Sequence, residues 1–280
     1  AYTETENDLT VKANKRTFIF SKKDGQLKGV SVDNRKINFA NGPRFIGARR
    51  ADRSLDQFYN HDDEKAKEKD RTYSEFPDAA VFTKLDVKED GGNLVVTANY
   101  KLGNLDKAQW TINPSGELAL DYTYNFSGVV DLMGIRFDYP EDQVISKRWL
   151  GAGPYRVWQN RIHGTQYDVW ENDYNDPIPG ETFTYPEFKG YFGNVSWMNI
   201  QTKEGTISLT NETPDAYIGV YQPRDGRDRL LYTLPESGIS VLNVIPPVRN
   251  KVNSTDLCGP SSQPKWVNGP QTGRVIFRFM

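Results

Sequence analysis

Residues 93–126, NLVVTANYKLGNLDKAQWTINPSGELALDYTYNF, carry the pattern that decides the fold. Short runs rich in β-branched and aromatic residues are separated by the turn-forming groups Gly103-Asn104 and Pro114-Ser115-Gly116. Turn signals at intervals of about 8–12 residues are typical of antiparallel sandwiches and barrels. The stretch therefore predicts three consecutive antiparallel strands, over 93–102, 107–112 and 117–126.

The same pattern continues on both sides of this stretch. Further strands are expected over 9–20, 29–37, 80–87, 134–139, 205–220, 238–244 and 273–280. Asp24-Gly25 predicts a tight turn, and the strand over 29–37 is expected to end at Asn41-Gly42-Pro43. The charged segment 52–75 is the exception, and we expect a short solvated helix or a loop there. Because the sequence has neither a long repeat nor a linker rich in Pro, Gly or Ser, we expect one all-β domain over 1–280.

The composition bears on partners and on compartment. The 280 residues carry a formal net charge of −2 with no polybasic block, so we expect neither a nucleic acid nor a membrane partner. Cys258 is the only cysteine, which excludes a disulfide within the chain and is compatible with the cytoplasm or the periplasm. The polar start AYTETENDLT lacks a signal-peptide core, so we expect a removed signal or a piece of a longer chain. We favour a periplasmic or secreted location.

A second informative stretch, 149–170, reads WLGAGPYRVWQNRIHGTQYDVW. Its Gly151-Ala152-Gly153-Pro154 segment predicts a sharp turn with positive φ at one glycine. Trp158 follows, together with the polar side chains of Arg156 and His163. Aromatic rings cover the apolar faces of a pyranose while guanidinium and amide groups meet its hydroxyls, so these residues predict a sugar-facing wall. The alternative is a corner of a sandwich with its rings packed inward.

This stretch resembles the conserved turn in the C-terminal domain of family 2 glycoside hydrolases of the β-galactosidase type. The family pattern is G-x-G-P-x-E-x-Y-x-D-R, and its matching residues here are Gly151, Gly153, Pro154 and Arg161. Trp158 replaces the tyrosine, while Arg156 and Asn160 replace the two acids. The resemblance implies a structural turn. We expect Arg161 to hold it through backbone carbonyls or through a carboxylate such as Glu171 or Glu187.

Other segments extend the resemblance over most of the chain. Gly42-Pro43 and Arg50-Ala51-Asp52 are similar to the start of the family's domain, and Tyr185-Pro186-Glu187 with Trp197 is similar to a later segment. The resemblance implies an antiparallel β-supersandwich with a galactose-mutarotase-like fold. In β-galactosidases, a loop before the last strand carries a tryptophan that stacks on the sugar. Trp266 matches it by position, and we expect a surface loop there; the alternative is a ring folded back on the sandwich.

The implied function is that of a non-catalytic domain, which caps a catalytic barrel and contacts a carbohydrate. Hydrolysis in this family uses two Glu residues of a (β/α)₈ barrel with their carboxyls about 5–5.5 Å apart, and a barrel takes about 250 residues. The resemblance leaves no room for one, so we expect no catalytic residues here. Two alternatives stay open: a free-standing epimerase or polysaccharide lyase, with His163 and Glu171 or Glu187 as acid and base, and a carbohydrate-binding module.

We expect no cofactor and no metal site. Asp173 and Asp176, with the neighbouring Asn172 and Asn175, offer oxygen ligands suited to Ca²⁺, but they lack EF-hand spacing. His61 lies in the charged segment beside two aspartates, and it is expected to be a surface residue, with metal ligation as the alternative.

Overall fold

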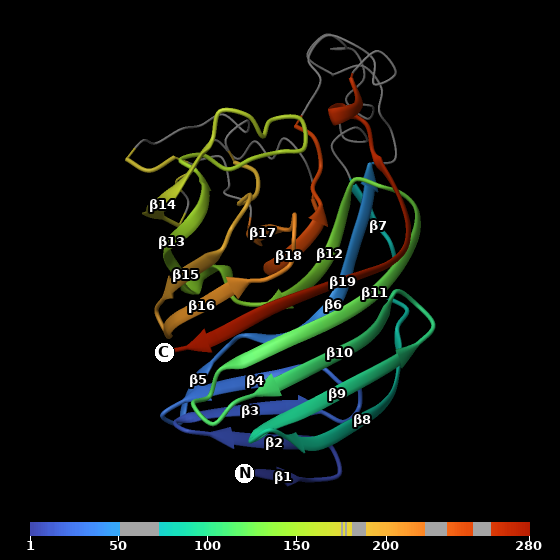
Figure 1. Ribbon diagram of the computed structural model, residues 1–280, viewed down its shortest axis with the longest axis vertical. Coiled ribbons are helices and arrows are strands. Elements are labelled where there is room, and N and C mark those ends of the chain that lie inside the picture. The colour runs from blue at the N-terminus through green and yellow to red at the C-terminus, as the bar shows by residue number, and fades with distance from the viewer. Residues whose placement is uncertain (51–72, 175, 177, 181–188, 222–233, 249–258) are drawn as a thin grey trace.

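The structure is a computed structural model that describes residues 1–50, 73–174, 176, 178–180, 189–221, 234–248 and 259–280. Its elements in this part are strands and two short 3₁₀ turns, η1 (Glu141–Gln143) and η4 (Pro260–Ser262). No helix among the described residues has the length and apolar character needed to cross a membrane. The expectation of an all-β fold is confirmed (Figure 1).

The strands follow one another along the chain as β1 (Tyr2–Glu4), β2 (Asp8–Ala13), β3 (Arg16–Ser21), β4 (Leu27–Val32), β5 (Arg35–Ile37), β6 (Ala40–Arg50), β7 (Tyr73–Glu75), β8 (Val81–Asp90), β9 (Asn93–Lys101), β10 (Leu105–Ile112), β11 (Leu118–Val130), β12 (Leu132–Asp138), β13 (Val144–Gly153), β14 (Gln166–Asp173), β15 (Trp197–Thr202), β16 (Gly205–Asn211), β17 (Tyr217–Val220), β18 (Ile239–Val244) and β19 (Lys265–Phe279).

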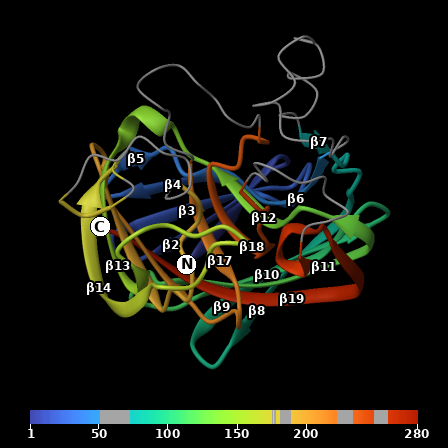
Figure 2. The same ribbon diagram turned by 90° about the horizontal axis from the view of Figure 1, so that it is seen from above.

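These strands form two antiparallel sheets. The first sheet has the order β1-β2-β3-β4-β6-β12-β18-β17, with β5 paired to β4 and β7 paired to β6. The second sheet has the order β14-β13-β15-β16-β19-β11-β10-β9-β8. Seen from above, β4 and β6 lie in one layer and β10 and β19 in the other (Figure 2). The last strand, β19, lies at the centre of the second sheet between β16 and β11. It therefore joins the two halves of that sheet.

Alternating burial explains why the opening stretch forms strands. In β10, Ala108, Trp110 and Ile112 are buried, whereas Gln109 and Thr111 between them are partly exposed. Successive side chains of a strand point to opposite faces, so this alternation places one face of the sheet on the core. The strands expected over 80–87, 93–102, 107–112 and 117–126 are present as β8 to β11.

The prediction of a strand end at Gly42-Pro43 is wrong. Strand β6 runs through these residues from Ala40 to Arg50. A Cβ atom on Gly42 would lie 2.3 Å from Cδ1 of Phe137, so the glycine leaves space for a core ring and does not end the strand. Of the charged segment 52–75, residues 52–72, which include His61, lie outside the described residues, and residues 73–75 form β7.

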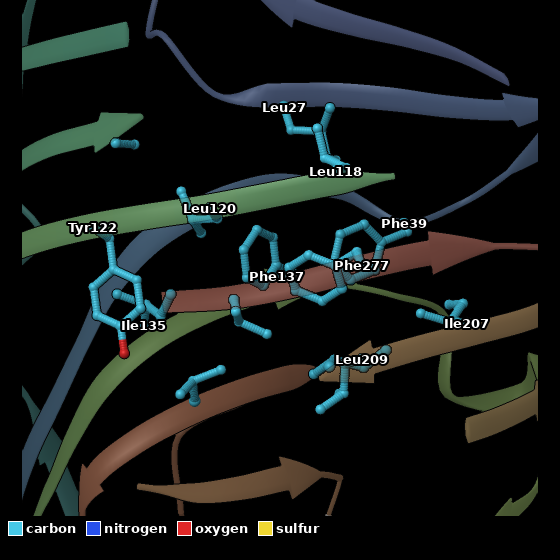
Figure 3. Close-up of a cluster of buried hydrophobic side chains, with 14 of the residues drawn as sticks. Leu27, Phe39, Leu118, Leu120, Tyr122, Ile135, Phe137, Ile207, Leu209 and Phe277 are labelled. Atoms are coloured by element: carbon cyan, nitrogen blue, oxygen red, sulfur yellow. The ribbon is translucent and has the colours of Figure 1, made fainter. Parts of the chain in front are cut away.

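A layer of aromatic rings fills the space between the sheets. Phe137 of β12 stacks on Phe39 with ring centroids 4.8 Å apart and meets Phe277 of β19 edge-on at 5.3 Å. All three side chains are fully buried, and Leu118 and Leu120 of β11 pack near them (Figure 3). Removing a buried phenylalanine ring typically lowers stability by about 3–5 kcal/mol, so this layer is a principal source of stability.

Two stacked tyrosines in this core predict how stability depends on pH. Burial raises the pKa of Tyr122 to about 12, and burial together with the nearby Tyr122 raises the pKa of Tyr124 well above its ordinary value. An unfolded chain loses these protons near pH 10, before the folded chain does, so stability is full below about pH 10 and is lost as the pH rises from there. We expect urea titrations to show this loss, with a smaller slope in Tyr124→Phe. Equal slopes in the two proteins would contradict the assignment.

Candidate functional site

The Gly151-Ala152-Gly153 segment lies inside a sheet and not at a turn. It forms the end of β13, where residues 151–153 pair with residues 166–168 of β14. Neither glycine has positive φ, so both parts of the turn prediction are wrong. A Cβ on Gly151 would lie 3.0 Å from the Asn194 carbonyl oxygen, and a Cβ on Gly153 would lie 2.4 Å from the Trp170 ring. The glycines are needed because neighbouring groups approach the strand closely.

The reversal of the chain comes after Pro154. The backbone N–H of Arg161 donates to the carbonyl of Trp158 at 2.9 Å, and the Trp158 N–H donates back to Arg161 at 3.3 Å. A bridge between Val157 and Tyr191 holds the segment before this turn. Arg161 is an exposed residue. Glu187, one of its expected partners, lies outside the described residues, and the role of Arg161 stays a prediction.

Two of the residues expected to contact sugar are buried inside the domain. Trp158 is 2% exposed and meets Tyr191 edge-on, with ring centroids 5.7 Å apart. Arg156 is 1% exposed, and its guanidinium lies over the Phe192 ring at 5.6 Å. The Val157–Tyr191 bridge holds the backbone between these two residues, and their burial agrees with the alternative of rings packed inward. In this arrangement neither side chain reaches an external ligand.

His163, the remaining residue of the expected sugar wall, and Glu171 are both at the surface. His163 is exposed, and its carbonyl accepts a hydrogen bond of 2.7 Å from the Tyr155 hydroxyl. Glu171, the expected partner of His163 in an acid–base pair, is exposed and has Arg148 at 3.9 Å. The hydroxyl bond fixes the backbone at His163 and leaves its imidazole at the surface.

Trp266 is the most exposed aromatic side chain among the large hydrophobic residues of the described structure, at 72%. It lies in β19 opposite Val129 of β11, one residue after the strand begins, so the expectation of a loop at this position is wrong. The long pairing of β19 with β11 extends beyond the final strand expected over 273–280. The ring therefore projects from a strand that is held by a continuous ladder.

Lys147 is a buried cation that the sequence pattern did not reveal. Its side chain is fully buried, and Nζ donates to the carbonyl of Asp173 at 3.1 Å and to that of Tyr174. Burial lowers the pKa of Lys147 well below its ordinary value, the charge of Arg156 adds to this effect, and Asp176 and Asp173 oppose it. Burial also lowers the pKa of Arg156 to about 10. The one sequence signal for its burial is that Lys147 lies two residues before Trp149, on the face of β13 that points to the core.

Asp173 and Asp176 are the candidate ligands for Ca²⁺ that the sequence offers. The Asp173 carbonyl is used by Lys147, and the Asp176 carbonyl accepts from the Asn172 side chain. Among the residues that the structure describes, no three His, Cys, Asp or Glu side chains gather closely enough to hold a metal ion. Asn175 lies outside the described residues.

The architecture defines a class of protein: an antiparallel β-sandwich of the galactose-mutarotase type. A galactose 1-epimerase from Lactobacillus acidophilus NCFM shares the fold with a TM-score of 0.52 and 9% identity, over 100% of this chain and 97% of that one. A galactose mutarotase-like protein from Lactobacillus casei ATCC 334 has a TM-score of 0.47 and 11% identity, over 98% of this chain and 100% of that one.

The family is given by the sequence. Residues 12–250 match the family described as beta galactosidase small chain, so the chain belongs to that family. The expected resemblance to β-galactosidases is confirmed, and the chain is a sugar-related domain. Among curated proteins, none matches the chain significantly.

Gly153 provides a test of the close approach to Trp170. We expect Gly153→Ala to lower the free energy of unfolding by about 1–3 kcal/mol, because its methyl group would overlap the indole. Urea titration measures the effect. The control is Gly259→Ala, where φ is −63° and a Cβ would meet open space. Equal stability of the two variants would show that the strand adjusts freely.

Lys147 provides a test of the buried charge. Because its folded-state pKa is lowered, the unfolded chain binds more protons between that pKa and about 10.5, so the contribution of Lys147 to stability rises with pH in this window. We expect the stability of the natural protein relative to Lys147→Met to increase between about pH 7 and pH 9.5, by up to about 1.4 kcal/mol per pH unit. Urea titrations at both pH values measure it. A constant difference would mean that the charge is not desolvated.

Proposed function

We propose that this chain is the non-catalytic C-terminal domain of a β-galactosidase-like glycoside hydrolase of family 2. It acts as one domain over residues 1–280, caps a catalytic (β/α)₈ barrel and contributes Trp266 to the sugar site. Membership in the beta galactosidase small-chain family supports the assignment. In this proposal the pair of carboxylates for hydrolysis belongs to the barrel, and the sandwich sheets of the described strands are consistent with that division.

The observation that carries the proposal is the exposure of Trp266. A large indole that is 72% exposed loses the stabilisation that burial would give it, and its apolar face is open to a ligand. The ring is presented by a strand and not by a loose loop, so little ordering is needed when a ligand arrives. An indole face suits the apolar face of a galactose ring.

Substitution of Trp266 in the complete enzyme tests the proposal. We expect Trp266→Ala to weaken binding of a β-galactoside by about 1–3 kcal/mol, which is roughly 5- to 150-fold in Kd, because the stacking surface is lost. Isothermal titration with a non-hydrolysed galactoside measures it. Stability should change little, because the ring contributes little to the core.

The matched control is Tyr2→Ala. Tyr2 is also an exposed aromatic residue of a strand, at 43%, but β1 lies at the opposite end of the molecule from the start of β19 (Figure 1). Its loss should leave affinity unchanged. Unchanged affinity in Trp266→Ala would overturn the proposal, and sugar turnover by this chain alone would favour a free-standing epimerase or lyase.

A further inference from the structure

The segment that leads into Trp266 is held by a side chain from a distant part of the sequence. Nε2 of Gln159 donates to the carbonyl of Ser261 at 2.8 Å and to that of Gln263 at 2.6 Å. Gln159 is 8% exposed, so these bonds are shielded from water. Gln263 lies three residues before Trp266, at the end of η4. A buried amide thus fixes the backbone just before the strand that carries the exposed ring.

The next residue of the same turn makes a second attachment. Nδ2 of Asn160 donates to the carbonyl of Val248 at 2.7 Å, and Oδ1 accepts from the Val248 N–H at 2.8 Å. Nδ2 also lies 3.4 Å from Oγ of Ser262, which is buried. Gln159 adds a backbone bond of 3.0 Å to the carbonyl of Pro246. The turn therefore connects the chain after β18 to the chain before β19.

The chemistry of these bonds requires amides. Gln159 donates twice and Asn160 both donates and accepts, whereas a carboxylate only accepts. An aspartate at 160 would keep the bond from the Val248 N–H and place a negative charge against the Val248 carbonyl. Asn160 stands where the related pattern has an acid, so in this chain the amide makes an attachment that an acid cannot make.

The backbone that carries the Trp266 ring is thus held by two independent sets of bonds. The β11 ladder fixes it from one side, where Trp266 pairs with Val129 and Lys265 with Val130. Gln159 fixes the backbone from the other side, at Gln263. A strand end attached on one side only would fray, because terminal residues open most easily.

We propose that Gln159 and Asn160 are positioning residues for Trp266. Gln159 acts through the backbone carbonyls of Ser261 and Gln263, and Asn160 acts through the Ser262 hydroxyl and the Val248 backbone. The effect on sugar affinity rests on the proposed function of Trp266, whereas the effect on the segment itself does not. The two are therefore tested by separate measurements.

The first measurement is amide hydrogen exchange in the purified chain. Gln159→Met keeps the shape of the side chain but removes its donors, and Asn160→Asp removes a donor without changing size. We expect peptides covering 259–266 to exchange at least several-fold faster in both variants, with peptides covering 93–112 unchanged. Circular dichroism and thermal melting check folding. Asn104→Asp is the matched control, since Asn104 donates to the Asn125 carbonyl elsewhere on the surface.

Unchanged exchange at 259–266 in folded variants would overturn the positioning role. If Gln159→Met does not fold, Asn160→Asp and the isosteric variant Gln159→Glu are used in its place. Unchanged exchange at 259–266 in these variants would also overturn the positioning role.

The second measurement is a double-mutant cycle on galactoside affinity in the complete enzyme. We expect Gln159→Met to weaken binding by up to the factor found for Trp266→Ala, and to have no further effect when Trp266 is already alanine. A loss in Trp266→Ala without any loss in Gln159→Met would overturn positioning and keep the proposed function. No loss in Trp266→Ala would overturn the proposed function, while the exchange data would still decide the role of Gln159 and Asn160.

Discussion

Closure of the two sheets over a shared layer of aromatic rings is the constraint on which the rest of the structure depends. Phe137 comes from the first sheet and Phe277 from the second, and Phe39, which lies between β5 and β6 in the sequence, stacks on Phe137. Because Phe277 lies on β19, burial of its ring fixes the last strand at the centre of the second sheet. The same strand carries Trp266, so the core that stabilises the fold also determines where the exposed ring stands.

The two Gly-Pro segments show a common consequence of this dense packing. Gly42 lies against Phe137 and Gly153 lies against Trp170, in both cases at a distance that no side chain would permit. Local rules for glycine and proline favour turns at such positions. Here, rings from other strands contact the backbone so closely that the strand must have a residue without a side chain at that position. Tertiary packing therefore overrides the local preference.

The segment that resembles a family turn has two structural roles. Arg156 and Trp158 point inward, where burial and the Phe192 and Tyr191 rings determine their environment. Gln159 and Asn160, on the same turn, hold the chain before β19. In the proposed function, the exposed ring of Trp266 offers contact area to a ligand, and this segment positions it.

The sequence by itself determined the all-β class, the strands over 80–126 and the family, because alternation and turn spacing are local properties and the motif is linear. It also predicted a sugar contact at Trp266, through position alone, and this stays a prediction. It could not determine which aromatic residues are buried, since a ring in a core and a ring on a sugar are chemically alike. The tertiary structure decided that Trp158 lies inside, and that Gln159 meets residues over a hundred positions away. Such contacts depend on how the sheets close and not on any neighbouring residue.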